Sequence, residues 1–264
     1  MARAPQHRGK RSAPPLHERG SIGGWLLRAL GLLLLAWLLF TSIPVLLLRW
    51  LHPLTTAFML EARAQAALAG ERRYRTDYVW VSLEQIAPNA AIAVIASEDQ
   101  QFPFHAGFDF SSIREAVRAS ERGRRLRGAS TISQQVAKNL FLWAGRSFVR
   151  KGLEAYFTVL IESMWPKERI LEMYLNIAQF GTGIYGVQAA AERFWHTPAA
   201  RLTSSEAALL AAVLPNPERL HADRPSRYVM SRRDWILDQM RDLGGPAYLR
   251  ALESERRALP QGAR

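Results

Sequence analysis

Residues 128–139 read Gly-Ala-Ser-Thr-Ile-Ser-Gln-Gln-Val-Ala-Lys-Asn and predict a helix that begins near Ser130. Four polar residues of this helix are spaced at i, i+3, i+4 and i+7 and therefore share one face: Thr131, Gln134, Gln135 and Lys138. A stripe of hydrogen-bonding groups that ends in a cation suits a sugar and a phosphate. The alternative, an ordinary solvated face, is weakened because two glutamines are unexpected in so arginine-rich a chain.

Upstream, an apolar run from Ala90 to Ala96 leads directly to two adjacent carboxylates, Glu98 and Asp99. Apolar surroundings raise the proton affinity of a carboxylate, and a general base that works near neutral pH needs such a raised affinity. Glu98 is the candidate base. The alternative, a solvated helix end, remains open from spacing alone. His105 taken alone is more often a hydrogen-bonded structural histidine than a catalyst.

Downstream, Glu154 lies three residues after Lys151 and four after Arg150, so a carboxylate stands beside two cations on one helix surface. This arrangement is either an ordinary helix ion pair, worth under ~0.5 kcal/mol, or a holder for a diphosphate beside an acid. The helix continues with a core-facing stripe at three- and four-residue spacing: Leu153, Phe157, Leu160, Ile161 and Met164.

Other local signals also favour helices. Ser112 with Glu115, and Thr203 with Glu206, have the spacing of capping boxes. Pro166 suits the first turn of a helix that runs through residues 170–175. The run 78–81 is compatible with a strand and predicts at most one small hairpin. The part of the chain after residue 48 is therefore predicted to be mainly α.

Residues 29–48 contain no formal charge over twenty positions, and a twenty-residue helix rises ~30 Å, enough to cross the hydrocarbon core of a bilayer. No small-residue cleavage site follows, so the segment is predicted to be an uncleaved transmembrane anchor rather than a signal peptide. Basic residues dominate positions 1–28, which places the N-terminus in the cytoplasm and everything after residue 48 outside it. A buried core helix is the less favoured alternative.

The amino-acid composition restricts both the kind of partner and the kind of catalysis. Lys and Arg number 35 against 23 Asp and Glu, a net charge of +12, which predicts an anionic partner. Because the globular part is exported, this partner is not expected to be nucleic acid. The chain has no cysteine, which excludes disulfides, Cys-ligated metals and thiol catalysis.

Residues 181–186 match the pattern G-x-G-x-x-G of dinucleotide-binding loops, and Glu206 lies at the distance of a ribose-binding acid. The context argues against a nucleotide. A helix rather than a strand is predicted before the glycines, no βαβ unit follows, and a capping box already accounts for Glu206. The glycines are therefore interpreted as a tight turn between helices.

The motifs, taken in order, resemble those of the peptidoglycan glycosyltransferases, which polymerise lipid II into glycan strands. The matching residues are Glu98-Asp99-x-x-Phe102-x-x-His105-x-Gly107-x-Asp109, Gly128-x-Ser130-Thr131-x-x-Gln134-Gln135-x-x-Lys138-Asn139, Arg150-Lys151-x-x-Glu154 and Lys167-x-x-Ile170-Leu171-Glu172-x-Tyr174-Leu175-Asn176. The segments 165–167 and 181–194 are similar in particular to the monofunctional Gram-negative enzymes. No Ser-x-x-Lys occurs, so the transpeptidase chemistry of bifunctional relatives is not expected. Gln179 and Gln188 stand where relatives often have glutamate, which is expected to tune rather than abolish activity.

The resemblance implies a mainly α, lysozyme-like, two-lobed glycosyltransferase domain preceded by one N-terminal transmembrane helix. The expected organisation is a basic cytoplasmic tail (1–28), a transmembrane helix (29–48), a membrane-proximal linker (49–89), a catalytic core (90–220), and a C-terminal helix with a basic tail (221–264). It also implies a single-pass protein of the bacterial inner membrane, with the N-terminus in the cytoplasm and the catalytic domain in the periplasm.

The resemblance further implies the reaction. Glu98 would deprotonate the acceptor 4-hydroxyl, which displaces undecaprenyl diphosphate with inversion, and Glu154 would be the second catalytic carboxylate. The implied substrate-binding residues are Asp99, Ser130, Thr131, Gln134, Gln135, Lys138, Arg150 and Lys151. No protein-bound metal site is expected, no cofactor is required, and Mg²⁺ or Mn²⁺ is optional.

The expected partners are lipid II, the growing glycan chain and membrane lipids, with cell-division or elongation proteins as candidate protein partners. Two other classes of function remain as alternatives. A lytic transglycosylase or muramidase would cleave the same polymer with one acid glutamate and without the cation cluster. A non-catalytic cell-wall scaffold would keep the fold but tolerate Glu98→Gln.

Overall fold

The computed structural model describes residues 22–111, 114, 118, 130–145, 147–250 and 252. Most of the basic N-terminal tail, the expected Ser112–Glu115 capping box and the C-terminal tail from residue 253 lie outside these residues. The chain divides into two compact units, residues 1–43 and residues 44–264.

The first helix, α1, runs over Ile22–Leu47. Its stretch Gly23–Leu47 is long and apolar enough, by length and composition, to cross a membrane. The helix begins before the expected span at residues 29–48 and includes Arg28. One arginine near the end of such a helix is tolerated, since its long side chain can reach the polar interface.

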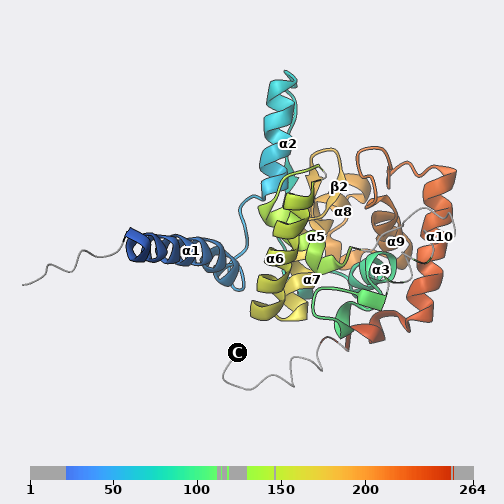
Figure 1. The fold of residues 1–264 in the computed structure, drawn as a ribbon. Helices are drawn as coiled ribbons and strands as arrows, with labels where there is room; N and C mark the ends of the chain where they lie inside the picture. Colours follow the sequence, from blue (N-terminus) through green and yellow to red (C-terminus); the bar gives the residue numbers. More distant parts are fainter. Residues whose placement is uncertain are drawn as a thin grey trace, which may run out of the picture. The chain divides into compact units, whose positions relative to one another are not determined.

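The second unit is mainly helical, as expected, and its helices form two groups (Figure 1). In the first group, α5 packs against α6, α7 and α2, and in the second, α3, α9 and α10 pack together. The helices of the first group are α2 (Ala57–Leu68), α5 (Ile132–Phe141), α6 (Phe148–Met164) and α7 (Lys167–Ile177). Those of the second are α3 (Pro88–Glu98), α9 (Ser204–Val213) and α10 (Arg227–Asp242), and α8 (Val187–Trp195) precedes α9 in the chain. Short 3₁₀ turns complete the unit at Leu83–Gln85, Phe102–Phe104, Ala199–Arg201 and Gly245–Leu249.

Capping residues and apolar spacing account for the local structure of several helices. The Thr203 side chain accepts from the Glu206 amide while the Glu206 side chain reaches back to Thr203, so the expected capping box at the start of α9 is confirmed. Helix α7 begins directly after Pro166, which serves as its N-cap rather than its first turn. The expected stripe of α6 is also confirmed: Phe157 and Ile161 are buried, and Leu153, Leu160 and Met164 pack partly buried against the core.

The small sheet explains the glycine-rich segment. Its strands are β1 (Asp77–Tyr78), β2 (Gln179–Gly181) and β3 (Ile184–Tyr185), in the order β1-β3-β2. Gly183 has φ +72°, and a Cβ there would lie 2.3 Å from the Arg75 carbonyl oxygen. The segment therefore joins α7 to α8, as expected, but as a hairpin rather than a simple turn. The expected strand at 78–81 is reduced to β1, which pairs in parallel with β3 rather than forming a hairpin of its own.

Helix α3 is buried on every side along residues 90–96, each of which is at most 2% exposed. An apolar helix of this kind belongs in the centre of a core. In Figure 1 it lies beside α9 and α10, and it also contacts α7 of the other group. The carboxylate that ends α3, Glu98, is thereby placed where the two helix groups meet.

Gly107 is a position where no side chain fits. Its φ is +86°, and a Cβ would lie 2.7 Å from Thr158 Cγ2 and 2.9 Å from Glu162 Cγ. We expect Gly107→Ala to lower the free energy of unfolding by about 2–4 kcal/mol, because the cost of a strained φ adds to the cost of overpacking. Differential scanning fluorimetry of the purified protein should show a melting temperature lower by roughly 5–15 °C.

Gly70 provides the matched control for this variant. It has φ +74° but open space around the Cβ position, so Gly70→Ala tests the backbone strain without the clash. We expect it to cost about 1–2 kcal/mol. Equal melting temperatures for the two variants would contradict the packing argument at Gly107.

Candidate active site

Glu98 is the last residue of α3, and its side chain is 16% exposed. Its Oε2 accepts a hydrogen bond of 2.9 Å from Gln135 Nε2, and Arg232 Nη2 lies 3.9 Å from its Oε1. Burial raises the pKa of the Glu98 carboxyl, and the hydrogen bond from Gln135 and the nearby cations oppose this rise. The alternative of a solvated helix end was wrong, since the carboxylate is largely withdrawn from water.

Tyr174 fixes the orientation of the amide that contacts Glu98. The Tyr174 hydroxyl donates to Gln135 Oε1 at 3.1 Å, so the Gln135 amide nitrogen is turned toward Glu98. Burial raises the pKa of Tyr174 well above its ordinary value, which keeps the hydroxyl protonated as a donor. Although Tyr174 stands in the last of the motifs, it was not among the expected site residues.

A cluster of cations is held by Glu154, whose side chain is only 4% exposed. Arg150 Nη1 lies 2.8 Å from Glu154 Oε2, and Lys151 Nζ donates to Glu154 Oε1. The expected i+3 and i+4 pairs therefore both form. Because one buried carboxylate carries two basic partners, the cluster keeps a surplus of positive charge.

Lys138 is close enough to both carboxylates, Glu98 and Glu154, for each to raise its pKa. Its Nζ is 5.2 Å from the centre of the Phe58 ring, and in the described part of the chain it has no ion pair within 4.0 Å. Burial is the largest cause that lowers the pKa of Lys138; Arg150 and Lys151 act in the same direction, and Glu154 and Glu98 oppose it. Helix α5 thus links the two carboxylates: its Gln135 contacts Glu98, its Lys138 interacts electrostatically with both, and it packs against α6, which carries Glu154.

Three residues that are expected to bind substrate have hydrogen-bond partners inside the protein. Asp99 Oδ2 accepts from the Ile132 amide at 2.9 Å, and the Asp99 carboxylate also contacts His105 Nε2 at 2.9 Å. Thr131 is the N-cap of α5, and the Gln134 side chain folds back to accept from the Thr131 amide at 3.0 Å. Because α5 begins at Ile132 rather than Ser130, Thr131 and Gln134 cap the helix, and their roles in binding substrate stay predictions.

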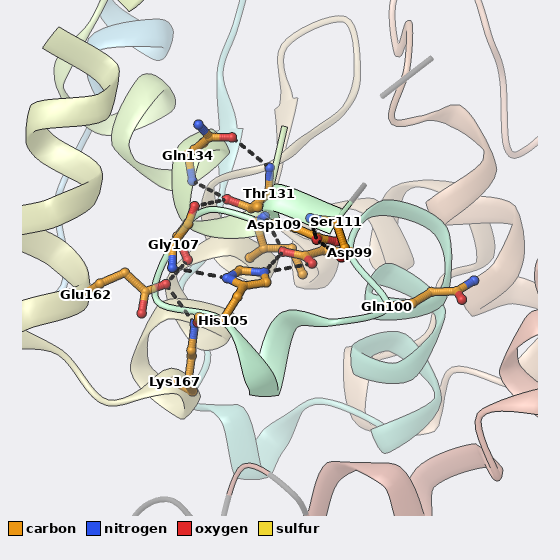
Figure 2. A network of polar contacts seen from close by, with 12 residues as sticks. Asp99, Gln100, His105, Gly107, Asp109, Ser111, Thr131, Gln134, Glu162 and Lys167 are labelled. Carbon is orange, nitrogen blue, oxygen red and sulfur yellow. Dashed lines mark hydrogen bonds and ion pairs between the residues drawn. The ribbon is translucent and has the colours of Figure 1, made fainter. Parts of the chain in front are cut away.

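A polar network supports the loop that follows α3 (Figure 2). The His105 ring lies between Asp99 and the Gly107 amide, which donates to His105 Nδ1 at 3.1 Å. Lys167 is 3% exposed, and its Nζ lies 2.8 Å from Glu162 Oε1 and donates to the His105 carbonyl. His105 is thus a structural histidine, and this network positions α5 relative to α3.

A cleft of about 690 Å³ opens beside Glu98. One wall carries Ser97, Glu98, Ser130 and Gln135, and the other comes largely from α10: Tyr228, Ser231, Arg232 and Trp235. Ser130 and Gln135, which are expected to bind substrate, thus line the same cleft as Glu98. The α10 residues were missed, although the 3–4 spacing of Tyr228, Arg232 and Trp235 is visible in the sequence.

The described residues contain no group of three or more His, Cys, Asp or Glu side chains that could hold a metal ion. Each oxygen of the Glu154 carboxylate accepts from a basic side chain. That carboxylate therefore fits a cation-positioning role better than metal ligation.

Comparison with known proteins agrees with this geometry. A family model described as Transglycosylase matches residues 65–241. The chain is 52% identical over 242 residues to a biosynthetic peptidoglycan transglycosylase of Xanthomonas campestris pv. campestris (strain B100), covering 92% of this chain and 96% of that protein. It is also 52% identical to a protein of the same name from Pectobacterium carotovorum, over 88% of this chain and 96% of that one. A third, from Klebsiella oxytoca, is 57% identical over 74% of this chain and 81% of its own. The chain therefore belongs to the transglycosylase family, among the biosynthetic peptidoglycan transglycosylases.

Proposed function

We propose that this chain polymerises lipid II into linear glycan strands for cell wall synthesis, releasing undecaprenyl diphosphate. The observation that carries the proposal is the convergence of a buried, proton-accepting Glu98 with Lys138 and the Glu154-bound cations. A lytic enzyme needs one acid and releases no diphosphate, so its reaction does not require a cluster of cations. A non-catalytic scaffold does not require a carboxylate with a raised pKa in an open cleft.

The proposed step follows from this geometry. The Glu98 carboxylate takes the proton of the acceptor 4-hydroxyl as that oxygen bonds to the anomeric carbon of the donor. The bond from that carbon to the diphosphate oxygen breaks on the opposite face, so the configuration is inverted. Negative charge then builds on the leaving diphosphate, where Lys138, Arg150 and Lys151 stabilise it. Glu154 positions these cations.

The positive charge in the cluster also supports the proposal that Mg²⁺ or Mn²⁺ is optional. Three basic side chains stand where a divalent ion would otherwise neutralise a diphosphate. The reaction is therefore proposed to proceed without a required cofactor, and the assay below includes EDTA as a separate arm.

We further propose that α1 anchors the chain in the inner membrane as a single pass, with the basic residues 1–28 in the cytoplasm and the catalytic unit in the periplasm. Phe148 and Val149 precede Arg150 in α6 and are 98% and 71% exposed. This apolar surface beside the diphosphate-binding cations suits the start of the polyprenyl tail. Anchoring raises the effective concentration of enzyme toward a substrate that exists only in the membrane.

The test is a polymerisation assay with purified lipid II and the full chain in detergent or liposomes. Polymerisation produces glycan chains and undecaprenyl diphosphate, whereas a lytic enzyme shortens added glycan and a scaffold does neither. Inhibition by moenomycin would give further support. We expect EDTA to lower the rate by less than tenfold, and a strict need for a divalent ion would overturn the metal proposal alone.

The pKa directions at the site predict a bell-shaped pH profile. Glu98 must be ionised to accept a proton, and its raised pKa moves the loss of activity in acid above the ordinary glutamate value of 4.5. Lys138 must be protonated to stabilise the diphosphate, and its lowered pKa moves the loss of activity in base below the ordinary lysine value of 10.5. Measuring kcat/KM against pH checks both limbs. An acid limb at or below 4.5 would contradict the role of Glu98.

A further inference from the structure

The Tyr174 hydroxyl is a polar group on a ring that is otherwise packed in the core. Tyr174 belongs to α7 and is 1% exposed. A hydroxyl that is buried in this way costs free energy unless it is hydrogen-bonded. Among the described residues its one hydrogen-bond partner is Gln135 Oε1, at 3.1 Å. The hydroxyl is therefore satisfied only by the side chain that also contacts Glu98.

The chain of contacts crosses three helices. Glu98 ends α3, Gln135 belongs to α5 and Tyr174 belongs to α7, and α7 packs against both other helices. Gln135 Nε2 donates to Glu98 Oε2 at 2.9 Å, while Gln135 Oε1 accepts from Tyr174. Because the Gln135 amide is bound at both ends, the hydroxyl on α7 decides which end faces the carboxylate on α3.

The orientation of this amide matters because its two ends are chemically opposite. An ionised carboxylate can only accept hydrogen bonds and favours the amide nitrogen, whereas a protonated carboxyl carries a donor and can bind the amide oxygen. Turning the Gln135 amide over would leave the proton of the Tyr174 hydroxyl buried without an acceptor. Tyr174 therefore opposes the orientation that would stabilise the protonated form of Glu98.

The same contact leaves one oxygen of Glu98 available for chemistry. Oε2 accepts the hydrogen bond from Gln135, whereas Arg232 Nη2 lies 3.9 Å from Oε1, which is longer than a hydrogen bond. Glu98 is also one of the residues that line the cleft. Oε1 is thus the oxygen that can take the proton of an acceptor hydroxyl.

Several other groups act on the ionisation of Glu98. Burial has the largest effect and raises the pKa, and the neighbouring Asp99 acts weakly in the same direction. The hydrogen bond from Gln135 has the largest effect among the causes that lower the pKa, ahead of the charges of Arg232 on α10 and Lys138 on α5. The ionised form of the base therefore depends on the Gln135 donor more than on either nearby cation.

We propose that Tyr174 is a positioning residue of the reaction, which acts through the Gln135 amide to hold Glu98 in its ionised form with Oε1 free to take the acceptor proton. Tyr174 is not among the residues that line the cleft. This inference rests on the proposed function, in which Glu98 is the general base.

The first test measures the titration of Glu98 itself and needs no lipid II. The full chain in detergent is labelled with ¹³C at the side-chain carboxyl carbon of glutamate, and the Glu98 resonance is assigned by its loss in Glu98→Gln. We expect Tyr174→Phe to move the midpoint of this titration to higher pH by about one pH unit, because the amide can then turn its oxygen toward the base. An unmoved midpoint would overturn the inference.

Tyr248→Phe is the matched control, because it removes a hydroxyl near the same carboxylate without touching Gln135. The Tyr248 hydroxyl donates at 2.6 Å to the carbonyl of Gln100, two residues after Glu98. We expect the Glu98 midpoint to stay where it is in the wild type. Equal shifts in Tyr248→Phe and Tyr174→Phe would mean that any nearby hydroxyl has this effect, which would overturn the specific role of Tyr174.

A double-mutant cycle tests whether Tyr174 acts through Gln135. We expect Gln135→Met to raise the midpoint as well, because Glu98 loses its donor. In that background Tyr174→Phe should add no further shift. A shift of the same size with and without Gln135 would overturn the proposed route. Phenylalanine keeps the ring of Tyr174 in the core, and circular dichroism verifies that each variant is folded.

Kinetics with lipid II separate this inference from the proposed function. If the wild type polymerises lipid II, we expect the acid limb of kcat in Tyr174→Phe to move with the Glu98 midpoint, while KM stays within about threefold. Polymerisation with an unmoved acid limb in Tyr174→Phe would overturn the positioning role and leave the proposed function intact. A wild type that does not polymerise lipid II would instead overturn the proposed function itself.

Discussion

Glu98→Gln is expected to lower the rate of glycan polymerisation by about a thousandfold, which is within the range that a general base contributes. The amide has nearly the shape of the carboxylate and can still accept the hydrogen bond that Gln135 donates at 2.9 Å. It cannot take a proton from the acceptor hydroxyl. The variant therefore removes the chemistry and leaves the contacts, and single-turnover assays with lipid II measure the difference.

Stability shows whether this loss comes from catalysis or from folding. Burial raises the pKa of Glu98 in the folded state. At a pH above that pKa the ionised side chain therefore lowers the free energy of unfolding. At pH 8 the neutral glutamine should thus leave the melting temperature unchanged or higher. Glu192→Gln, at an exposed carboxylate of α8, is the matched control and should retain full activity. Polymerisation by Glu98→Gln within tenfold of wild type would mean that another group is the base.

The features that could be predicted from sequence depend on short chain separations. The Glu154 pairs with Arg150 and Lys151 follow from helical spacing of three and four residues. The α9 capping box is equally local. The apolar α1 needed only length and composition, and the helix extends before the expected span to include Arg28.

The features that sequence reasoning missed depend on contacts between distant segments. The capping role of Gln134 was missed because the periodicity was counted from a helix start near Ser130, whereas α5 begins at Ile132. The Asp99 carboxylate, 33 residues earlier in the chain, binds the Ile132 amide and so helps to set the first turn of α5. The Tyr174 contact to Gln135 spans 39 residues, and Arg232 meets Glu98 from a helix near the other end of the chain. Spacing within one element does not contain that information.

Lys138→Met is the second variant with a large expected effect, a fall in polymerisation rate of about 10²–10³-fold, as for loss of one group that stabilises developing charge. Methionine keeps an unbranched apolar stem against Phe58, where the Lys138 ammonium now lies 5.2 Å from the ring centre. The variant therefore removes the charge while preserving the packing. Lys151→Met is the matched control, and a smaller loss is expected because the Lys151 side chain is 49% exposed and its charge is screened by water.

The pH profile of Lys138→Met distinguishes an electrostatic role from a structural one. Lys138 lowers the Glu98 pKa, so removing its charge should raise that pKa further. The acid limb of the residual activity should then move to higher pH than in the wild type, while Lys151→Met moves it less. A merely structural lysine would lower the rate without moving this limb. An acid limb that stays in place, together with a rate within about threefold of wild type, would show that Lys138 shares no active site with Glu98.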